Sequence, residues 1–121
     1  MTKSVAGLFG AAALALTVTA ALAVEDINSS ANLTMPLCRV LIDHTNLFTL
    51  NANALMGAGH CAGIIEGLSY AGSGICAPPS GFFNTQAIKI VVVYIDARPA
   101  RLHEPFLKLA IEALRDAWPC R

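Results

Sequence analysis

The sequence predicts a small, mainly helical domain that is exported and cross-linked by two disulfide bonds. Three observations predict this class: an N-terminal leader, four cysteines that all follow the leader, and two segments with apolar residues at helical spacing. A domain of roughly 100 residues can build a hydrophobic core, but its stability is modest. Disulfides worth about 3–4 kcal/mol each are therefore expected to support that core.

Residues 1–23 have the pattern of a secretory signal peptide. Lys3 supplies a short positive region, an uncharged run rich in Ala, Leu and Val covers residues 5–20, and "ALA" at 21–23 is a small-x-small cleavage site. The apolar run is short for a membrane-spanning helix, which needs about 20 residues. We therefore expect cleavage after Ala23, export of residues 24–121, and no membrane span in the mature chain.

The charge balance excludes two classes of partner. The chain has eight basic and eight acidic residues, and loss of Lys3 with the leader leaves a net charge of −1. Nucleic-acid-binding domains and proteins that bind anionic membranes carry a basic face, which this composition does not provide. We expect neither nucleic acid nor a membrane surface as a partner.

The cysteines all lie in the mature part, at Cys38, Cys61, Cys76 and Cys120. An even number of cysteines in an exported domain of this size predicts two disulfides. Three pairings are possible, and the residues alone do not select one of them.

The N-terminal part of the mature chain, residues 24–58, has the weakest pattern. Residues 24–34 are polar and are expected to form a lead-in, and "PLCRVLI" at 36–42 fits either a first helix or an extended arm. Asp43 or Thr45 is a suitable cap for a short helix after it. The apolar residues of that helix would be Leu47, Phe48, Leu50 and Leu55.

The next segment, residues 59–71, has clear helical spacing. Cys61, Ile64, Ile65 and Leu68 fall at i, i+3, i+4 and i+7, which makes one apolar stripe. "GSG" at 72–74 is a typical helix end.

Small residues recur every four positions in the same segment. The row consists of Gly59, Gly63, Gly67 and Ala71. It is not a phosphate loop, because Gly-Lys-Ser/Thr is missing, and it is not a membrane dimer motif, because His60 and Glu66 lie within it. A glycine ridge forms a groove that lets a second helix pack closely, which must offset about 1 kcal/mol per interior glycine. We predict a buried helix–helix contact at this row, within the chain or between two chains.

Residues 86–97, "QAIKIVVVYIDA", fit two structures. Their β-branched and aromatic residues slightly favour a strand on propensity alone. The stripe Ile88, Val91, Val92 and Ile95 fits a helix equally well, with Pro99 as its stop.

The last segment, residues 103–118, is the clearest helix. Pro105 lies near its start, where a missing N–H has no cost, and Pro119 ends it. Its apolar face consists of Leu107, Ala110, Leu114 and Trp118, joined by Phe106, Leu109 and Ala113. Lys108, Glu112 and Arg115 on the polar face are at pairing distances.

No catalytic or metal-binding set can be assembled from the sequence. His60 and Cys61 are neighbours and point about 100° apart on a helix, and neither Cys-x-x-Cys nor His-Glu-x-x-His occurs. Four paired cysteines leave no thiol nucleophile, the Gly-x-Ser-x-Gly elbow is missing, and the carboxylates are scattered. We expect a protein that is not an enzyme and needs no metal or cofactor.

A charged turn between Pro99 and Pro105 is the candidate partner interface. Its residues are Arg98, Arg101, His103 and Glu104. The turn either binds a charged partner or is an ordinary solvated turn with an acid near a helix N-terminus, and the second arrangement is the commoner one.

The second half of the chain contains an ordered set of motifs. They are Cys61-x-Gly63-x-Ile65-x-Gly67, Cys76-x-Pro78, the run through Tyr94 to Pro99, "RLHEP" at 101–105 and "EALRDAWPC" at 112–120. With this order and spacing, residues 59–121 resemble the Rap/Tai family, which are periplasmic immunity proteins of type VI secretion amidase effectors. Residues 24–58 are the divergent N-terminal helical segment, and residues 36–121 are expected to form one compact domain.

The resemblance implies an all-α fold, a bundle of about four helices, and so a helix over residues 86–97. It also implies a periplasmic protein that covers the active cleft of a cell-wall amidase, often as a homodimer. In an up-and-down bundle, the ends of the helix at 59–71 and of the last helix lie close together, which favours Cys76–Cys120 and leaves Cys38–Cys61. The alternative function is a small helical envelope protein with a chaperone-like or structural role.

Overall fold

The structure is a computed structural model that describes residues 30–44, 46–70 and 72–121. The predictions for the signal peptide, for Thr45 as a cap and for Ala71 therefore fall outside the described residues. Within these ranges the chain forms four α-helices and two short 3₁₀ turns and has no β-strand, which confirms the all-α prediction. The two isolated bridges, Ser30 with Pro105 and Ile75 with Pro119, only join ends of elements.

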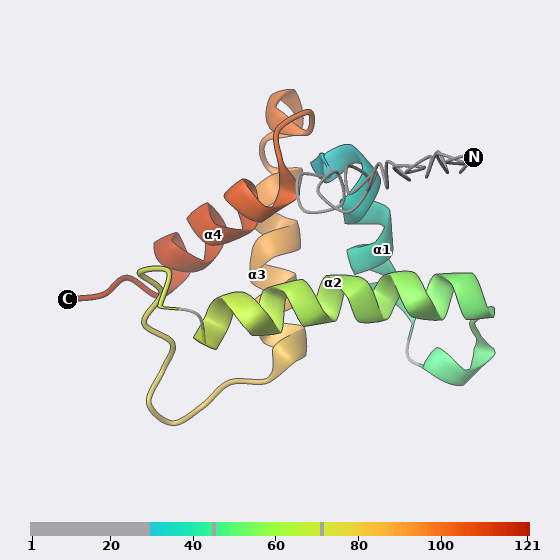
Figure 1. Ribbon diagram of the computed structural model, residues 1–121, viewed down its shortest axis with the longest axis horizontal. Coiled ribbons are helices and arrows are strands. Elements are labelled where there is room, and N and C mark those ends of the chain that lie inside the picture. Colours follow the sequence, from blue (N-terminus) through green and yellow to red (C-terminus); the bar gives the residue numbers. More distant parts are fainter. Residues whose placement is uncertain (1–29, 45, 71) are drawn as a thin grey trace, which may run out of the picture.

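The elements are α1 (Ala31–Asp43), η2 (Leu47–Thr49), α2 (Ala52–Tyr70), α3 (Asn84–Asp96), η3 (Pro99–Arg101) and α4 (Phe106–Ala117). Most of them follow one another with short connections, and only the connection between α2 and α3 is long. Figure 1 shows α3 crossing behind the long helix α2, with α1 and α4 on either side of α3. The longest connection, between α2 and α3, runs beside the C-terminal end of the chain.

One hydrophobic core lies where the four helices meet. Each helix contributes a stripe at helical spacing, such as Ala31, Met35 and Cys38 on α1. The largest fully buried side chains are Phe106, Met35, Ile65, Ile88, Ile95, Leu109, Leu114 and Val91. Residues of the divergent segment and of the family-like segment thus share this core.

The segment with strand-like composition is helix α3, so the slight strand preference from propensity was wrong. Its buried side chains include Ile88, Val91, Val92 and Ile95, which is the helical stripe rather than the alternation of a strand. A lone strand would also leave its backbone N–H and C=O groups without partners, and the described chain offers no second strand to supply them. Burial and backbone pairing therefore override local propensity.

Helix α2 begins at Ala52, seven residues before the predicted start at residue 59. The side chain of Asn51 accepts a hydrogen bond from the backbone N–H of Ala54 at 2.9 Å, which is the geometry of an N-cap. The preceding apolar residues do not form the predicted short helix. Leu47 and Phe48 lie in the turn η2, and Phe48 is 99% exposed.

Two disulfides cross-link the bundle, and they join the pairs that the up-and-down arrangement favoured. Cys38–Cys61 connects α1 to α2 with a Cα–Cα distance of 5.3 Å, and both residues are fully buried. Cys76–Cys120 connects the segment after α2 to the chain end, with a Cα–Cα distance of 4.9 Å, and both residues are exposed. The second pair is held in place by a hydrogen bond from the Cys76 N–H to the Trp118 carbonyl, at 2.9 Å.

Candidate partner-binding surface

The charged turn between α3 and α4 is held by ion pairs within the chain. Arg101 donates from Nε to Glu104 Oε1 at 2.7 Å and from Nη2 to Glu104 Oε2 at 2.9 Å. The same guanidinium reaches Glu112 on α4, with Nη1 2.8 Å from Oε2. Lys108 Nζ lies 2.7 Å from Glu104 Oε2. These contacts fix the turn to the first turns of α4.

The ion pairs change the acidity of the two carboxyl groups. Hydrogen bonds from Arg101, followed by those from Lys108, lower the pKa of Glu104 from 4.5 to about 2. The pKa of Glu112 is lowered as well, mainly by its hydrogen bond from Arg101. The pKa of Arg101 is raised by the same two partners, so all three groups stay charged at neutral pH.

The start of helix α1 docks on the same turn. The backbone N–H of Ala31 donates to the carbonyl of Glu104, and that of Asn32 donates to the carbonyl of Leu102, both at 2.9 Å. The first N–H groups of a helix have no partner within the helix, so these bonds satisfy two of them. The turn is therefore held by hydrogen bonds from α1 as well as by ion pairs with α4.

The four interface candidates consequently differ in availability. Arg101 and Glu104 are occupied by each other, whereas Arg98 and His103 form none of the ion pairs found among the described residues. The guanidinium of Arg98 lies 3.6 Å from the centre of the Tyr94 ring and donates to the Tyr94 carbonyl at 2.8 Å. His103 is exposed. Of the predicted set, Arg98 and His103 are thus the side chains left for a partner.

A groove of about 460 Å³ lies beside Arg98, between the outer sides of α3 and α4. Its α3 wall includes Ile90, Val93 and Ala97, and its α4 wall includes Ala113 and Ala117. No motif in the sequence predicted this groove. Val93 was the one sign of it in the sequence. This apolar residue lies on the helix face that also carries Lys89, where a solvated helix normally has polar side chains.

The glycine row on α2 faces solvent. A Cβ atom added to Gly59, Gly63 or Gly67 would meet no neighbouring atom within 4 Å, so the predicted contact within the chain is wrong for these three glycines. The reason is that the buried stripe of α2 runs through Cys61 and Ile65, on the opposite face. The closest approach is at Gly57, where a Cβ would lie 2.6 Å from Leu37 Cδ2. Contact with a second chain stays a prediction.

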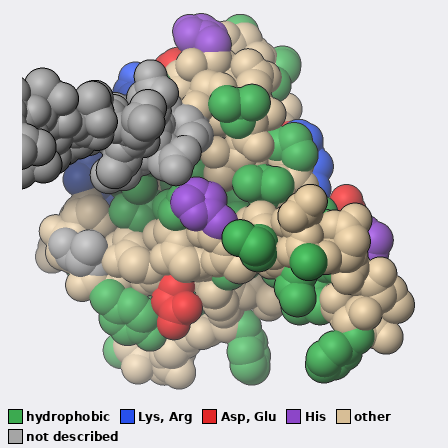
Figure 2. Space-filling view, turned by 45° about the vertical axis from the view of Figure 1, so that its right-hand side comes forward, with side chains coloured by type: hydrophobic (Ala, Val, Ile, Leu, Met, Phe, Trp, Pro, Cys, Tyr) green, Lys and Arg blue, Asp and Glu red, His purple; other side chains and the backbone are tan. Residues whose placement is uncertain are grey.

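Large apolar side chains are exposed at several separate places. Among the described residues they are Leu33, Leu47, Phe48, Leu55, Met56, Tyr70, Phe83 and Val93. In Figure 2 hydrophobic side chains stand apart from one another on the face shown, with polar and backbone atoms between them. Singly exposed apolar residues are normal in globular proteins, so only those beside a groove or cluster bear on binding.

The described ranges contain neither a cluster of metal ligands nor a membrane-spanning helix. No group of three or more His, Cys, Asp or Glu side chains is arranged to hold a metal ion there. None of the helices formed by residues 30–44, 46–70 and 72–121 is both long and apolar enough to cross a membrane.

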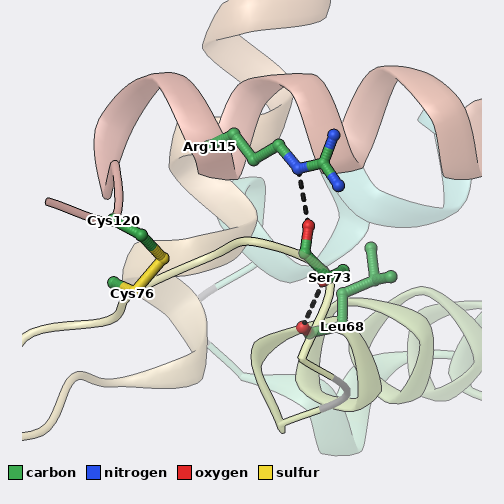
Figure 3. The surroundings of a disulfide bond; sticks show 5 residues. All are labelled: Leu68, Ser73, Cys76, Arg115 and Cys120. Atoms are coloured by element: carbon green, nitrogen blue, oxygen red, sulfur yellow. Dashed lines mark hydrogen bonds between the residues drawn. A yellow bond between two sulfur atoms is a disulfide. The ribbon is translucent and has the colours of Figure 1, made fainter.

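The end of α2 and the end of α4 are joined beside the exposed disulfide. Figure 3 shows Arg115 of α4 pointing at the carbonyl of Ser73, with Nε donating at 2.6 Å, close to Cys76–Cys120. The Ser73 hydroxyl in turn donates to the carbonyl of Leu68 at 3.1 Å, at the end of α2. These two hydrogen bonds and the disulfide therefore stabilise the end of the bundle where α2 and α4 end.

Comparison with known proteins identifies the family. The family of Rap1a immunity proteins matches residues 35–120, from helix α1 to the last cysteine. No curated protein and no solved structure matches the chain. The match begins well before residue 59, so it includes both disulfides as well as the segment that resembled Rap/Tai proteins. The chain therefore belongs to the family of Rap1a immunity proteins.

Proposed function

We propose that this protein is a periplasmic immunity protein that binds a type VI secretion peptidoglycan amidase and covers its active cleft. Its membership of the Rap1a immunity proteins, over residues 35–120, is the observation that carries this function. An immunity protein acts by binding an effector protein. The amidase as target is supported by the resemblance of residues 59–121 to immunity proteins of amidase effectors.

The location in the periplasm is supported by the leader and by the disulfides. Residues 1–23 have the signal-peptide pattern, and disulfides form and persist in oxidising compartments. Peptidoglycan lies in the same compartment, so an inhibitor of a wall-cleaving amidase must be exported to meet it.

A binding role without catalysis is supported by the cysteines. All four are paired, so no thiol is available as a nucleophile. The carboxyl groups with shifted pKa values, Glu104 and Glu112, are engaged by Arg101. Their pKa shifts are thereby explained by structural ion pairs.

The proposal predicts that a neighbouring gene encodes a peptidoglycan amidase, and the test uses that enzyme. The two mature proteins are mixed, and binding is measured by calorimetry and amidase activity by release of peptides from purified peptidoglycan. We expect a stable complex and loss of the activity. No complex, together with no loss of protection when the gene is deleted, would falsify the proposed function.

A matched control separates location from binding. A form that begins at residue 24 lacks the leader and stays in the cytoplasm. Oxidised and purified, it should inhibit the amidase as well as the exported form. In cells that receive the amidase in the periplasm, it should give no protection. Protection by the leaderless form would contradict the periplasmic role.

The second candidate, a chaperone-like envelope protein, is favoured by an exposed aromatic side chain beside a second hollow. Phe83 is 81% exposed and lines this hollow together with Phe82, which suits transient contact with unfolded clients. A light-scattering assay of a denatured client protein at neutral and low pH distinguishes the two functions. The immunity role predicts no suppression of aggregation at a molar ratio of one to one.

A further inference from the structure

We propose that the groove between α3 and α4 is the docking site for a partner segment that carries an apolar side chain and a carboxylate. The apolar side chain fills the groove, and Arg98 receives the carboxylate. This site rests on the proposed effector-binding function, because it assigns the surface through which the effector is held.

The groove exists because the facing residues are small. Ala97 on the α3 side and Ala113 and Ala117 on α4 leave space that larger side chains would fill. Its volume of about 460 Å³ falls in the range of ordinary ligand sites, which is roughly 300–1,000 Å³. It is thus large enough for a bulky apolar side chain and the backbone next to it.

The wall of the groove presents an apolar side chain that the core does not use. Val93 is 69% exposed, while its neighbour Val92 is buried in the core. Ile90 is only partly buried on the same side of α3. Covering these side chains with an apolar group removes their surface from water, which is favourable.

Arg98 is already oriented for a carboxylate. Stacking on the Tyr94 ring and the hydrogen bond to the Tyr94 carbonyl hold the guanidinium at the edge of the groove. A guanidinium has five N–H donors, and the Tyr94 carbonyl uses one of them. The remaining donors suit a carboxylate, and little side-chain freedom is lost when they bind it.

The other charges at the groove favour an acidic partner over a basic one. Lys89 and Asp116 also line it, so its rim carries two positive charges and one negative charge. None of these three groups takes part in an ion pair within the described residues. A basic segment would be repelled by Arg98, and an uncharged apolar segment would desolvate Arg98 without replacing its water.

The decisive experiment measures binding of the neighbouring amidase to groove variants by calorimetry. Val93→Glu places a negative charge on the apolar wall, and Arg98→Glu reverses the charge that receives the carboxylate. We expect each to weaken binding at least tenfold, with Arg98→Lys in between. The matched control is Met56→Glu on α2, which is 74% exposed and lies outside the groove; it should change binding less than twofold. Circular dichroism and melting curves establish that each variant is folded.

A peptide probe tests the groove without the amidase. The ¹⁵N-labelled protein is titrated with acetyl-Leu-Leu-Glu-amide and, as a matched control, with acetyl-Leu-Leu-Lys-amide. We expect the acidic peptide to shift the backbone signals of Val93, Ala97 and Arg98, and the basic peptide to leave them in place. The shifts should disappear in Arg98→Glu.

The outcomes separate this inference from the proposed function. If the amidase binds the wild type and all groove variants equally, the groove assignment is wrong and the immunity function stands. If the amidase does not bind the wild type, the function is wrong, and the peptide titration alone decides the groove. If the variants change only self-association in sedimentation, a second copy of this chain occupies the groove and the proposal is overturned.

Discussion

Arg101 holds Glu104 with two parallel hydrogen bonds, from Nε to Oε1 at 2.7 Å and from Nη2 to Oε2 at 2.9 Å. The pair closes the turn on which the start of α1 also docks, through the carbonyl of Glu104 itself. This bidentate contact thus stabilises the turn that joins α3 to α4 and receives the start of α1. A bidentate pair of Arg and a carboxylate fixes the relative orientation of the two side chains in addition to attracting them.

This pair predicts an acid-sensitive contribution to stability. The pKa of Glu104 is lowered from 4.5 to about 2 in the folded protein, so the unfolded chain binds a proton first as the pH falls. The contribution is complete above about pH 4.5 and is lost as the pH falls towards 2. Urea unfolding from pH 7 to pH 2 should show this loss in the wild type.

The matched variants are Glu104→Gln and Asp116→Asn. The first should be less stable than the wild type at pH 7 and should lose less stability on acidification. The second should keep the wild-type stability at pH 7, because Asp116 has no ion pair within the described residues to lose. Equal acid sensitivity in Glu104→Gln and the wild type would show that Glu104 does not contribute.

The two disulfides should differ in their order of reduction. Cys76 and Cys120 are exposed, whereas Cys38 and Cys61 are fully buried between α1 and α2. A thiolate reductant must reach a sulfur atom to attack it. A low concentration of dithiothreitol under native conditions should therefore reduce Cys76–Cys120 first. Alkylation followed by peptide mass spectrometry identifies the reduced pair.

The stability effect of each disulfide gives a second check. Replacing either pair by alanine should lower the free energy of unfolding by about 3–4 kcal/mol, as closure of loops of this length predicts. The variant that lacks Cys76 and Cys120 should resist dithiothreitol until the protein unfolds. Early labelling of Cys38 or Cys61 in the wild type would contradict the predicted order.

The sequence predicted the buried faces of α3 and α4 better than the contacts between the helices, while the number of helices came from the family resemblance. The spacing of Ile88, Val91, Val92 and Ile95 fits a helix, and these side chains are buried on α3. Strand propensity pointed the other way, and only the resemblance to a helical family decided the prediction in favour of a helix. Periodicity shows which face of a segment is apolar. It does not show whether a second strand is present to pair with the segment, which a β-structure would need.

The polar contacts were predicted least well, because they depend on the bundle as a whole. The sequence placed Glu112 opposite Lys108 and Arg115, its neighbours on the helix. In the structure Glu112 pairs with Arg101, Lys108 pairs with Glu104, and Arg115 binds the Ser73 carbonyl. Spacing on one helix shows which ion pairs are possible within that helix. The ion pairs that form depend on the turn before α4, which brings Arg101 and Glu104 next to Glu112 and Lys108.

The exposed glycines of α2 predict a gain in stability on substitution. Gly63→Ala meets no atom within 4 Å, so it should raise the free energy of unfolding of the monomer by about 1 kcal/mol. Gly57→Ala should gain less, because its Cβ would lie 2.6 Å from Leu37 Cδ2 and displace that side chain. Urea unfolding of the two variants measures the difference.

The same position tests whether two chains pack along the glycine row. If the row is a dimer contact, Gly63→Leu should dissociate the dimer in sedimentation, because the larger side chain prevents close approach of the helices. If the protein is a monomer at all concentrations and Gly63→Leu has no effect, the predicted contact between chains is wrong.

Two glycines in the turn after α2 have the same kind of backbone conformation but different surroundings. Gly72 has φ of +64° and Gly74 has φ of +77°, a region where an L side chain costs about 1–2 kcal/mol. A Cβ on Gly72 would meet nothing within 4 Å, whereas one on Gly74 would lie 3.1 Å from Arg115 Nε, the atom that binds the Ser73 carbonyl (Figure 3).

Both Gly72→Ala and Gly74→Ala should therefore destabilise the protein, and Gly74→Ala should do so more, since it also displaces the Arg115 side chain. The excess should disappear when both variants are made in an Arg115→Ala background, because the contact that distinguishes them is then gone. Urea unfolding of the six proteins measures this coupling. If the excess persists without Arg115, the difference comes from the backbone of the turn and not from its hydrogen bond to α4.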